Sequence, residues 1–178
     1  MKPLYVNHLF SREDVHAIFS PNTNFTPQAG TWGLRGIIGI PDRERDYVFF
    51  VTYGQAQSGH EFDEGITEDG VLSWQSQPSQ DFQNKVVKNL ITHDDLVDNI
   101  YLFLREDKRE DYRYLGRLGY LSHDNSREKP VYFQWQLLNW HDLDASSAEI
   151  ASDDGDEQGL KPLQGELKYQ AEMPAKKR

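Results

Sequence analysis

The sequence predicts a single α+β domain that is mainly β: a small, partly open β-barrel with two short helices. Two observations support this fold class. The body of the chain holds six apolar runs of five to eight residues, each bounded by clusters of Gly, Pro, Asp or Asn, as is typical of short strands. Helical patterns occur in only two places and do not alternate with the strands, which argues against a βαβ repeat.

The first helix is expected to begin after Ser11 and to end near Ser20. A hydroxyl at the cap and acids in the first turn are typical helix starts, and Pro21 stops the pattern. One face of this helix is apolar, with Val15, Ile18 and Phe19. A second helix is expected to open at Ser79, because apolar residues follow at helical spacing: Phe82, Val86, Val87 and Leu90.

The strands are expected over residues 36–40, 47–53, 71–75, 100–105, 114–121 and 131–138. In the last of them, apolar and polar residues alternate, so that Val131, Phe133, Trp135 and Leu137 face one way and Tyr132, Gln134 and Gln136 the other. The run Tyr-Leu-Phe-Leu at 101–104 lacks polar alternation, which is typical of a central strand. The glycines at 33, 36 and 39 predict a glycine-rich turn that leads into the first strand.

Composition sets limits on the class of protein. The 178 residues contain no cysteine, which excludes disulfides, thiolate metal sites and a cysteine nucleophile, and fits a reducing compartment. We expect no signal peptide in the first ten residues and no membrane span, because no run approaches about 18 apolar residues. The sequence therefore predicts a cytoplasmic protein.

The charge is negative and uneven. The formal net charge is −10, with 20 acids and 14 bases in residues 1–141 and 9 acids and 5 bases in residues 142–178. Residues 144–159 are rich in Ser, Asp, Glu, Ala and Gly, and such a stretch cannot bury enough apolar surface to fold. We therefore expect a recognition domain over 1–141 and an acidic, disordered or loosely docked tail over 142–178.

Catalytic chemistry is sparse. The six histidines form no pair at the spacing of a metal site, and no Gly-x-Ser-x-Gly motif is present. We expect no metal, no cofactor and no catalytic residue. One alternative is a metal-dependent nuclease, in which Glu106 and Lys108 act with an upstream carboxylate from Asp94, Asp95 or Asp98.

The segment that follows the third apolar run suggests recognition. Trp74 is followed by Gln75, Ser76 and Gln77, and the segment closes a predicted strand. Amides donate and accept hydrogen bonds in fixed geometry, and an indole can stack on a nucleobase. The alternative interpretation is that Trp74 is a core residue beside a polar turn.

The order of several segments resembles a known family. Phe62-Asp63-Glu64 precedes the Trp74 segment by about ten residues, and Phe10-Ser11-Arg12 opens the first helix. The segments that follow are Tyr101–Arg105, Tyr114-Leu115-Gly116, Tyr120 with Ser122 and His123, Pro130 and Trp135. This order resembles the uncharacterised domain at the C-terminus of large restriction-associated helicases, including type IV restriction enzymes that join a phospholipase-D-like nuclease, a helicase and this domain.

The resemblance implies a PUA-like barrel similar to the SRA-type reader of 5-methyl- or 5-hydroxymethylcytosine. Such a reader extrudes one nucleotide from duplex DNA and stacks rings on its base. The implied stacking residues are Trp74, Phe62 and Tyr114, with Tyr53 as a further candidate. Asp63 or Glu64 would accept from the cytosine amine, and Gln75, Ser76 and Gln77 would bind the base edge or the backbone. The implied phosphate contacts are Arg35, Arg105, Arg117 and Lys85.

The sequence thus predicts a non-catalytic module of a restriction or defence system, whose partners are duplex DNA with a modified cytosine and a helicase or nuclease effector. Replacing Trp74 by alanine would then weaken DNA binding by ~1–3 kcal/mol, the usual size of one base-stacking contact. The −10 charge supports an alternative, an acidic protein-binding or DNA-mimic module. The nuclease is the second alternative.

Overall fold

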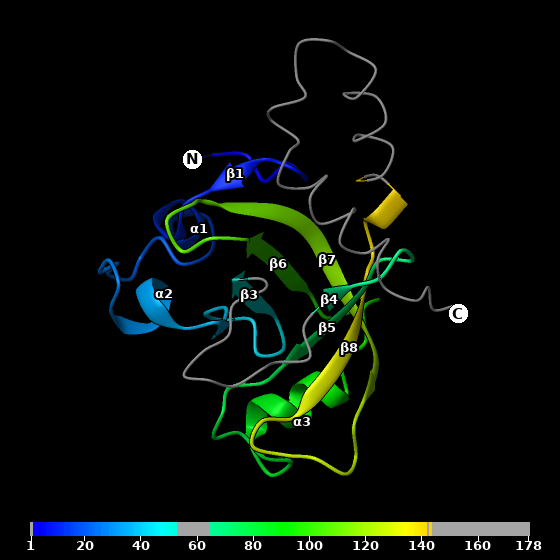
Figure 1. Ribbon diagram of the computed structural model, residues 1–178. Coiled ribbons are helices and arrows are strands. Elements are labelled where there is room, and N and C mark those ends of the chain that lie inside the picture. The colour runs from blue at the N-terminus through cyan, green and yellow to red at the C-terminus, as the bar shows by residue number, and fades with distance from the viewer. Residues whose placement is uncertain (1, 53–64, 142, 144–178) are drawn as a thin grey trace.

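The computed structural model describes residues 2–52, 65–141 and 143 (Figure 1). In this part of the chain, eight strands join in one hydrogen-bonded sheet. Seven of them follow one path across the sheet: β2 (Ile37–Gly39), β3 (Tyr47–Thr52), β6 (Ile100–Arg105), β7 (Tyr112–His123), β8 (Tyr132–Leu137), β5 (Val71–Gln75) and β4 (Gly65–Ile66). The eighth, β1 (Leu9–Phe10), pairs with β7.

The sheet is mixed and does not close into a barrel. β3 and β6 are parallel, and the other pairs are antiparallel. β2 and β4 stand at the two ends of the path. The predicted fold class, α+β and mainly β with a partly open architecture, is confirmed. All six predicted strands are present, and the sequence did not predict the two-residue strands β1 and β4.

The long strand β7 joins the two halves of the sheet. Its first part pairs with β6 and its second part with β8. Gly116 lies near the end of the first part, between Tyr114 and Arg117, where the register with β6 shifts. Its φ is +91°, and a β-carbon there would sit 2.3 Å from Oδ1 of Asn139. Only glycine fits such a backbone and such a close approach. The strand is therefore irregular just before its partner changes.

The first helix has the predicted bounds. α1 (Arg12–Phe19) begins after Ser11, whose Oγ accepts from the Asp14 amide at 3.0 Å, while the Asp14 carboxylate accepts from the Ser11 amide at 2.9 Å. This reciprocal pair is a capping box. The predicted start of the next helix is wrong: α3 (Lys85–Ile91) begins after Asn84 instead of at Ser79. Asn84 is the better cap, because its Oδ1 accepts from two amides in the first turn.

A third short helix, α2 (Gly30–Leu34), replaces the expected glycine-rich turn. Its sequence is a weak helix former, so tertiary contacts must hold it. Trp32 is buried in the core, and a β-carbon on Gly33 would lie 1.9 Å from the carbonyl oxygen of Thr26. The helix forms because glycine allows this close packing.

The sheet has a hydrophobic cluster on each face. One cluster contains Phe49, Leu102 and Trp135 together with α3 residues, and the other contains Phe50 and Phe103 together with residues of α1 and α2. Figure 1 shows α1 and α2 together at one side of the molecule and α3 apart from them. Residues of β3 and β6 are buried on both faces, which confirms the central strand predicted for 101–104.

The last described residue, Leu143, is fully buried. It belongs with Trp140 to the hydrophobic cluster that contains the α3 residues, which we call the α3-side cluster. The remainder of the predicted tail lies outside the described residues.

Among the described residues, no helix has the length and apolar character needed to cross a bilayer.

Candidate functional site

Trp74 lies in the interior. Its side chain is 8% exposed, and its ring centroid is 4.8 Å from that of Phe49 in the α3-side cluster. Tyr114 packs on the other face of the sheet, because it pairs in register with Phe103, a residue of the second cluster, and its ring lies 4.9 Å from that ring. Burial raises the pKa of Tyr114, and Tyr101 adds to this shift.

The sheet thus separates two of the predicted stacking residues. Phe49 and Phe50 are consecutive in β3 and so point to opposite faces. Trp74 packs against Phe49, and Tyr114 belongs to the same hydrophobic cluster as Phe50. The predicted pocket formed jointly by Trp74 and Tyr114 is not present.

The polar residues after Trp74 have mixed placements. Ser76 is buried and joins β5 to the start of β8, since its amide donates to the Val131 carbonyl at 2.9 Å and its Oγ accepts from the Val131 amide at 2.8 Å. This role is structural. The amide of Gln77 donates to Oε1 of Gln80 at 2.9 Å. Gln75 is buried and lies opposite Tyr132 in the register of β5 and β8.

The remaining predicted base contacts, Phe62, Asp63 and Glu64, lie outside the described residues, as does Tyr53. The predicted phosphate contacts divide into two kinds. Arg117 donates to the carbonyl of Asp95 and to Oδ1 of Asn99, and Lys85 pairs with Glu44 at 3.5 Å. The second kind consists of Arg35 and Arg105, which both lie beside Arg12.

Arg12 contacts the backbone of Arg35 and shares the Tyr112 ring with Arg105, and we call these three residues the arginine cluster. Arg12 is its centre: Nη1 donates to the carbonyls of Trp32 at 3.1 Å and Arg35 at 2.8 Å, and Nε donates to the Tyr112 hydroxyl at 3.2 Å. These bonds hold the end of α2 against α1. The guanidinium carbon also lies 4.3 Å from the Phe50 ring centroid, within cation–π range.

Arg105 reaches the same tyrosine from β6. Its guanidinium carbon lies 4.3 Å from the Tyr112 ring centroid, and its Nε donates to Oγ1 of Thr52 at 3.0 Å. Burial lowers the pKa of Arg12, and the charge of Arg105 lowers it further, while Tyr112 raises it. Arginine nevertheless stays charged at neutral pH. Two cations are therefore held around one ring.

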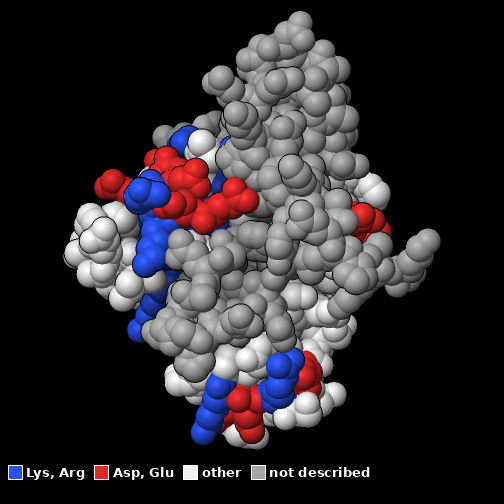
Figure 2. Space-filling view, viewed as in Figure 1, with Lys and Arg blue, Asp and Glu red and all other residues white. Residues whose placement is uncertain are grey.

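Within the described residues, the arginine cluster has no ion-pair partner. In the described part of the chain, no carboxylate lies within ion-pair distance of Arg12, Arg35 or Arg105. Of the acids in the turn after Arg105, Asp107 pairs with Arg109 at 2.8 Å, while Glu106, Glu110 and Asp111 line a hollow together with Arg105 without an ion pair to it. Figure 2 shows basic side chains in a column along one side of this face, with acidic side chains gathered above them.

Sequence reasoning missed Arg12 as a site residue. It was interpreted only as the first residue of a helix. The available signal was its place in Phe10-Ser11-Arg12, one of the segments on which the family resemblance rests. Its contact with Tyr112 spans 100 positions, and no local pattern predicts that contact.

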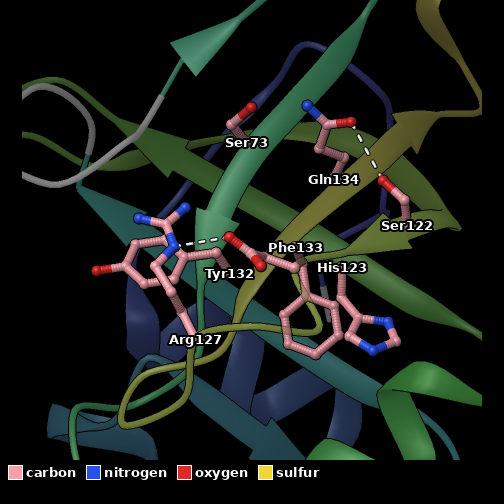
Figure 3. A pocket seen from close by; sticks show the side chains of 8 residues that line it. Ser73, Ser122, His123, Arg127, Tyr132, Phe133 and Gln134 are labelled. Atoms are coloured by element: carbon pink, nitrogen blue, oxygen red, sulfur yellow. Dashed lines mark hydrogen bonds and ion pairs between the residues drawn. The ribbon is translucent and has the colours of Figure 1, made fainter.

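A second feature is a hollow of about 440 Å³ over β5, β8 and the end of β7, which we call the polar hollow (Figure 3). Its lining comes from these strands and from the turn that follows β7: Ser73, Ser122, His123, Asp124, Arg127, Tyr132, Phe133 and Gln134. None of these residues was predicted as a site residue. The alternation of apolar and polar residues over 131–138 was the available sequence signal, because Tyr132 and Gln134 belong to its polar side.

The nuclease constellation is not assembled. Glu106 follows β6, and burial raises its pKa, with the charge of Glu110 adding to the shift. Asp98 precedes β6 and pairs with Arg45 at 3.1 Å. The strand separates the two carboxylates by roughly 20 Å, which is too far for one metal ion.

The fold and these features define a mainly β domain that carries an arginine cluster and a separate polar hollow. Residues 4–142 match the family model described as Domain of unknown function (DUF3427). The match spans most of the chain, which therefore belongs to this family. Comparison with curated proteins finds no match. The expectation of membership in an uncharacterised domain family is confirmed.

Proposed function

We propose that this chain is a non-catalytic module that binds duplex DNA containing 5-methyl- or 5-hydroxymethylcytosine, and that it serves a helicase or nuclease effector of a restriction system. The observation that carries this proposal is the arginine cluster. The protein has a formal net charge of −10, yet the guanidinium groups of Arg12 and Arg105 meet at the Tyr112 ring, next to the backbone of Arg35, and none of the three arginines has a carboxylate partner in the described chain. Such a group favours an external anion.

The chemistry of the cluster suits phosphate. A guanidinium offers planar pairs of N–H donors that match phosphate oxygens. Arg12 and Arg105 are fixed by hydrogen bonds and by ring contacts, so they lose little side-chain freedom on binding. Arg35 is exposed at the end of α2 and can reach outward. Three contacts predict modest affinity, because each phosphate neutralised adds only one counterion release.

The test is fluorescence anisotropy with three duplexes of one sequence that carry cytosine, 5-methylcytosine or 5-hydroxymethylcytosine. We expect tighter binding of a modified duplex and a linear decrease of log K with log salt. Arg35→Ala is expected to reduce the salt slope by about 1, the value for one lost phosphate contact. Lys88→Ala removes an exposed charge from α3 and is the matched control, with an unchanged slope.

Two outcomes would count against the proposal. Equal affinity for all three duplexes would leave a non-specific DNA-binding protein. Absence of binding to every duplex at low salt would favour the acidic DNA-mimic alternative.

A further inference from the structure

The polar hollow contains a row of three hydrogen-bonding side chains. Ser73 of β5 and Ser122 of β7 both lie opposite Gln134 of β8 in the register of the sheet. Residues opposite each other on neighbouring strands point to the same face. Phe133 and Trp135, which flank Gln134, face the core, so Gln134 faces outward. Figure 3 shows Ser122 and Gln134 directed toward each other, and their Oγ and Oε1 atoms are 3.2 Å apart.

A planar stack stands beside this row. The guanidinium carbon of Arg127 lies 3.9 Å from the ring centroid of Tyr132. Figure 3 shows the two side chains lying against each other. Asp124 fixes this guanidinium with a 2.7 Å ion pair to Nε. Hydrogen bonds from Ser126, and then the bond from Arg127, hold the pKa of Asp124 at about 2. Asp124 therefore stays ionised at neutral pH and balances the charge of Arg127.

The rings of His123 and Phe133 point to the other face of the sheet, because these residues pair in register and Phe133 faces the core. The outward face of the hollow thus combines hydroxyls, an amide, the flat Tyr132–Arg127 stack and a charge pair that nearly cancels.

The charge balance and the hydrogen-bonding groups of the hollow indicate which class of ligand it would bind. A cluster for free phosphate would carry a surplus of cations, whereas Arg127 here is balanced by Asp124. An amide and hydroxyls both donate and accept, which matches the edge of a pyrimidine, and flat groups favour a planar ring. A volume of about 440 Å³ is within the range of small-molecule sites.

We propose that the polar hollow binds a single pyrimidine base, namely the modified cytosine extruded from the duplex. This inference rests on the proposed function and assigns the base site to Ser73, Gln134 and Tyr132 in place of Trp74 and Tyr114. Gly36, which follows Arg35, packs close to β5: a β-carbon on it would lie 3.7 Å from Cζ2 of Trp74, the neighbour of Ser73 in that strand.

The first experiment uses a free nucleotide. ¹⁵N-labelled protein is titrated with 5-methyl-deoxycytidine monophosphate, and amide chemical shifts are followed. We expect shifts at Ser73, Ser122 and the Gln134 side-chain amide. Gln134→Leu is expected to weaken this binding about tenfold or more, the size of one lost base-edge contact. Gln83→Leu, at an exposed glutamine outside the hollow, is the matched control and is expected to bind normally.

The second experiment repeats the duplex titrations with Gln134→Leu. We expect its affinity for the modified duplex to fall to that for the plain duplex, with an unchanged salt slope, because the arginine cluster is intact. Ser73→Ala provides a second variant if Gln134→Leu does not fold by circular dichroism.

The outcomes separate the two proposals. If the wild type prefers modified duplex while both hollow variants bind it normally, the base site is elsewhere and the proposed function stands. If no duplex binds but the nucleotide binds in a Gln134-dependent way, the hollow is a nucleotide site and the DNA-reading function fails. If neither probe binds, both proposals are refuted.

Discussion

Replacing Trp74 by alanine is expected to destabilise the fold by about 3–5 kcal/mol, the usual cost of removing a large aromatic side chain from a core. The structure supports this magnitude. Trp74 is 8% exposed and packs against Phe49. An aromatic side chain buries about 150–250 Å², and about 25 cal/mol per Å² converts this area to roughly 4–6 kcal/mol. Little of this is recovered, because a rigid core relaxes only partly.

The assay is urea unfolding followed by circular dichroism, so that the loss of an indole does not remove the signal. Tyr5→Ala, at a ring that is 59% exposed, is the control and is expected to change the free energy of unfolding by less than about 0.5 kcal/mol. Trp74→Phe gives a measurable intermediate if the alanine variant does not fold. A loss below about 1 kcal/mol for Trp74→Ala would refute the core assignment and restore the ring as a candidate for stacking on DNA.

Two further predictions concern α3 and pH. Asn84→Ala is expected to lower the free energy of unfolding by about 0.5–2 kcal/mol, because it removes the acceptor that caps two amides of α3; urea unfolding measures this. Burial lowers the pKa of His93 below 6.5, although Nε2 donates to the Leu118 carbonyl. The unfolded state then binds the proton more readily, so stability is expected to fall as the pH drops below about 6.5, and unfolding series at several pH values measure this.

Each of these predictions has a control. Asn84→Asp keeps an oxygen acceptor at the cap and is expected to unfold near the wild-type midpoint; an equal loss in both variants would show that the cap is not the cause. His93→Gln removes the titrating group. Its stability is expected to vary less with pH than that of the wild type between neutral pH and about pH 5, and parallel curves for the two proteins would contradict the assignment.

Features determined by short stretches of sequence were predicted correctly. The capping box of Ser11 and Asp14 depends on residues three positions apart, and α1 has the predicted bounds. The apolar run at 101–104 indicated a central strand, because burial on both faces removes the need for alternation. The predicted start of α3 at Ser79 is wrong, because in the folded chain Asn84 caps the helix and only the tertiary structure shows this.

The sequence by itself determined the class of fold, six of the eight described strands and the alternation that turns Gln134 outward, since these depend on neighbours along the chain. Tertiary structure decided which side chains meet. It placed Trp74 and Tyr114 on opposite faces of one sheet, and it brought Arg12 to Tyr112 across 100 positions. The physical reason is that strand register and sheet order, which no local pattern encodes, set the distances between residues far apart in sequence.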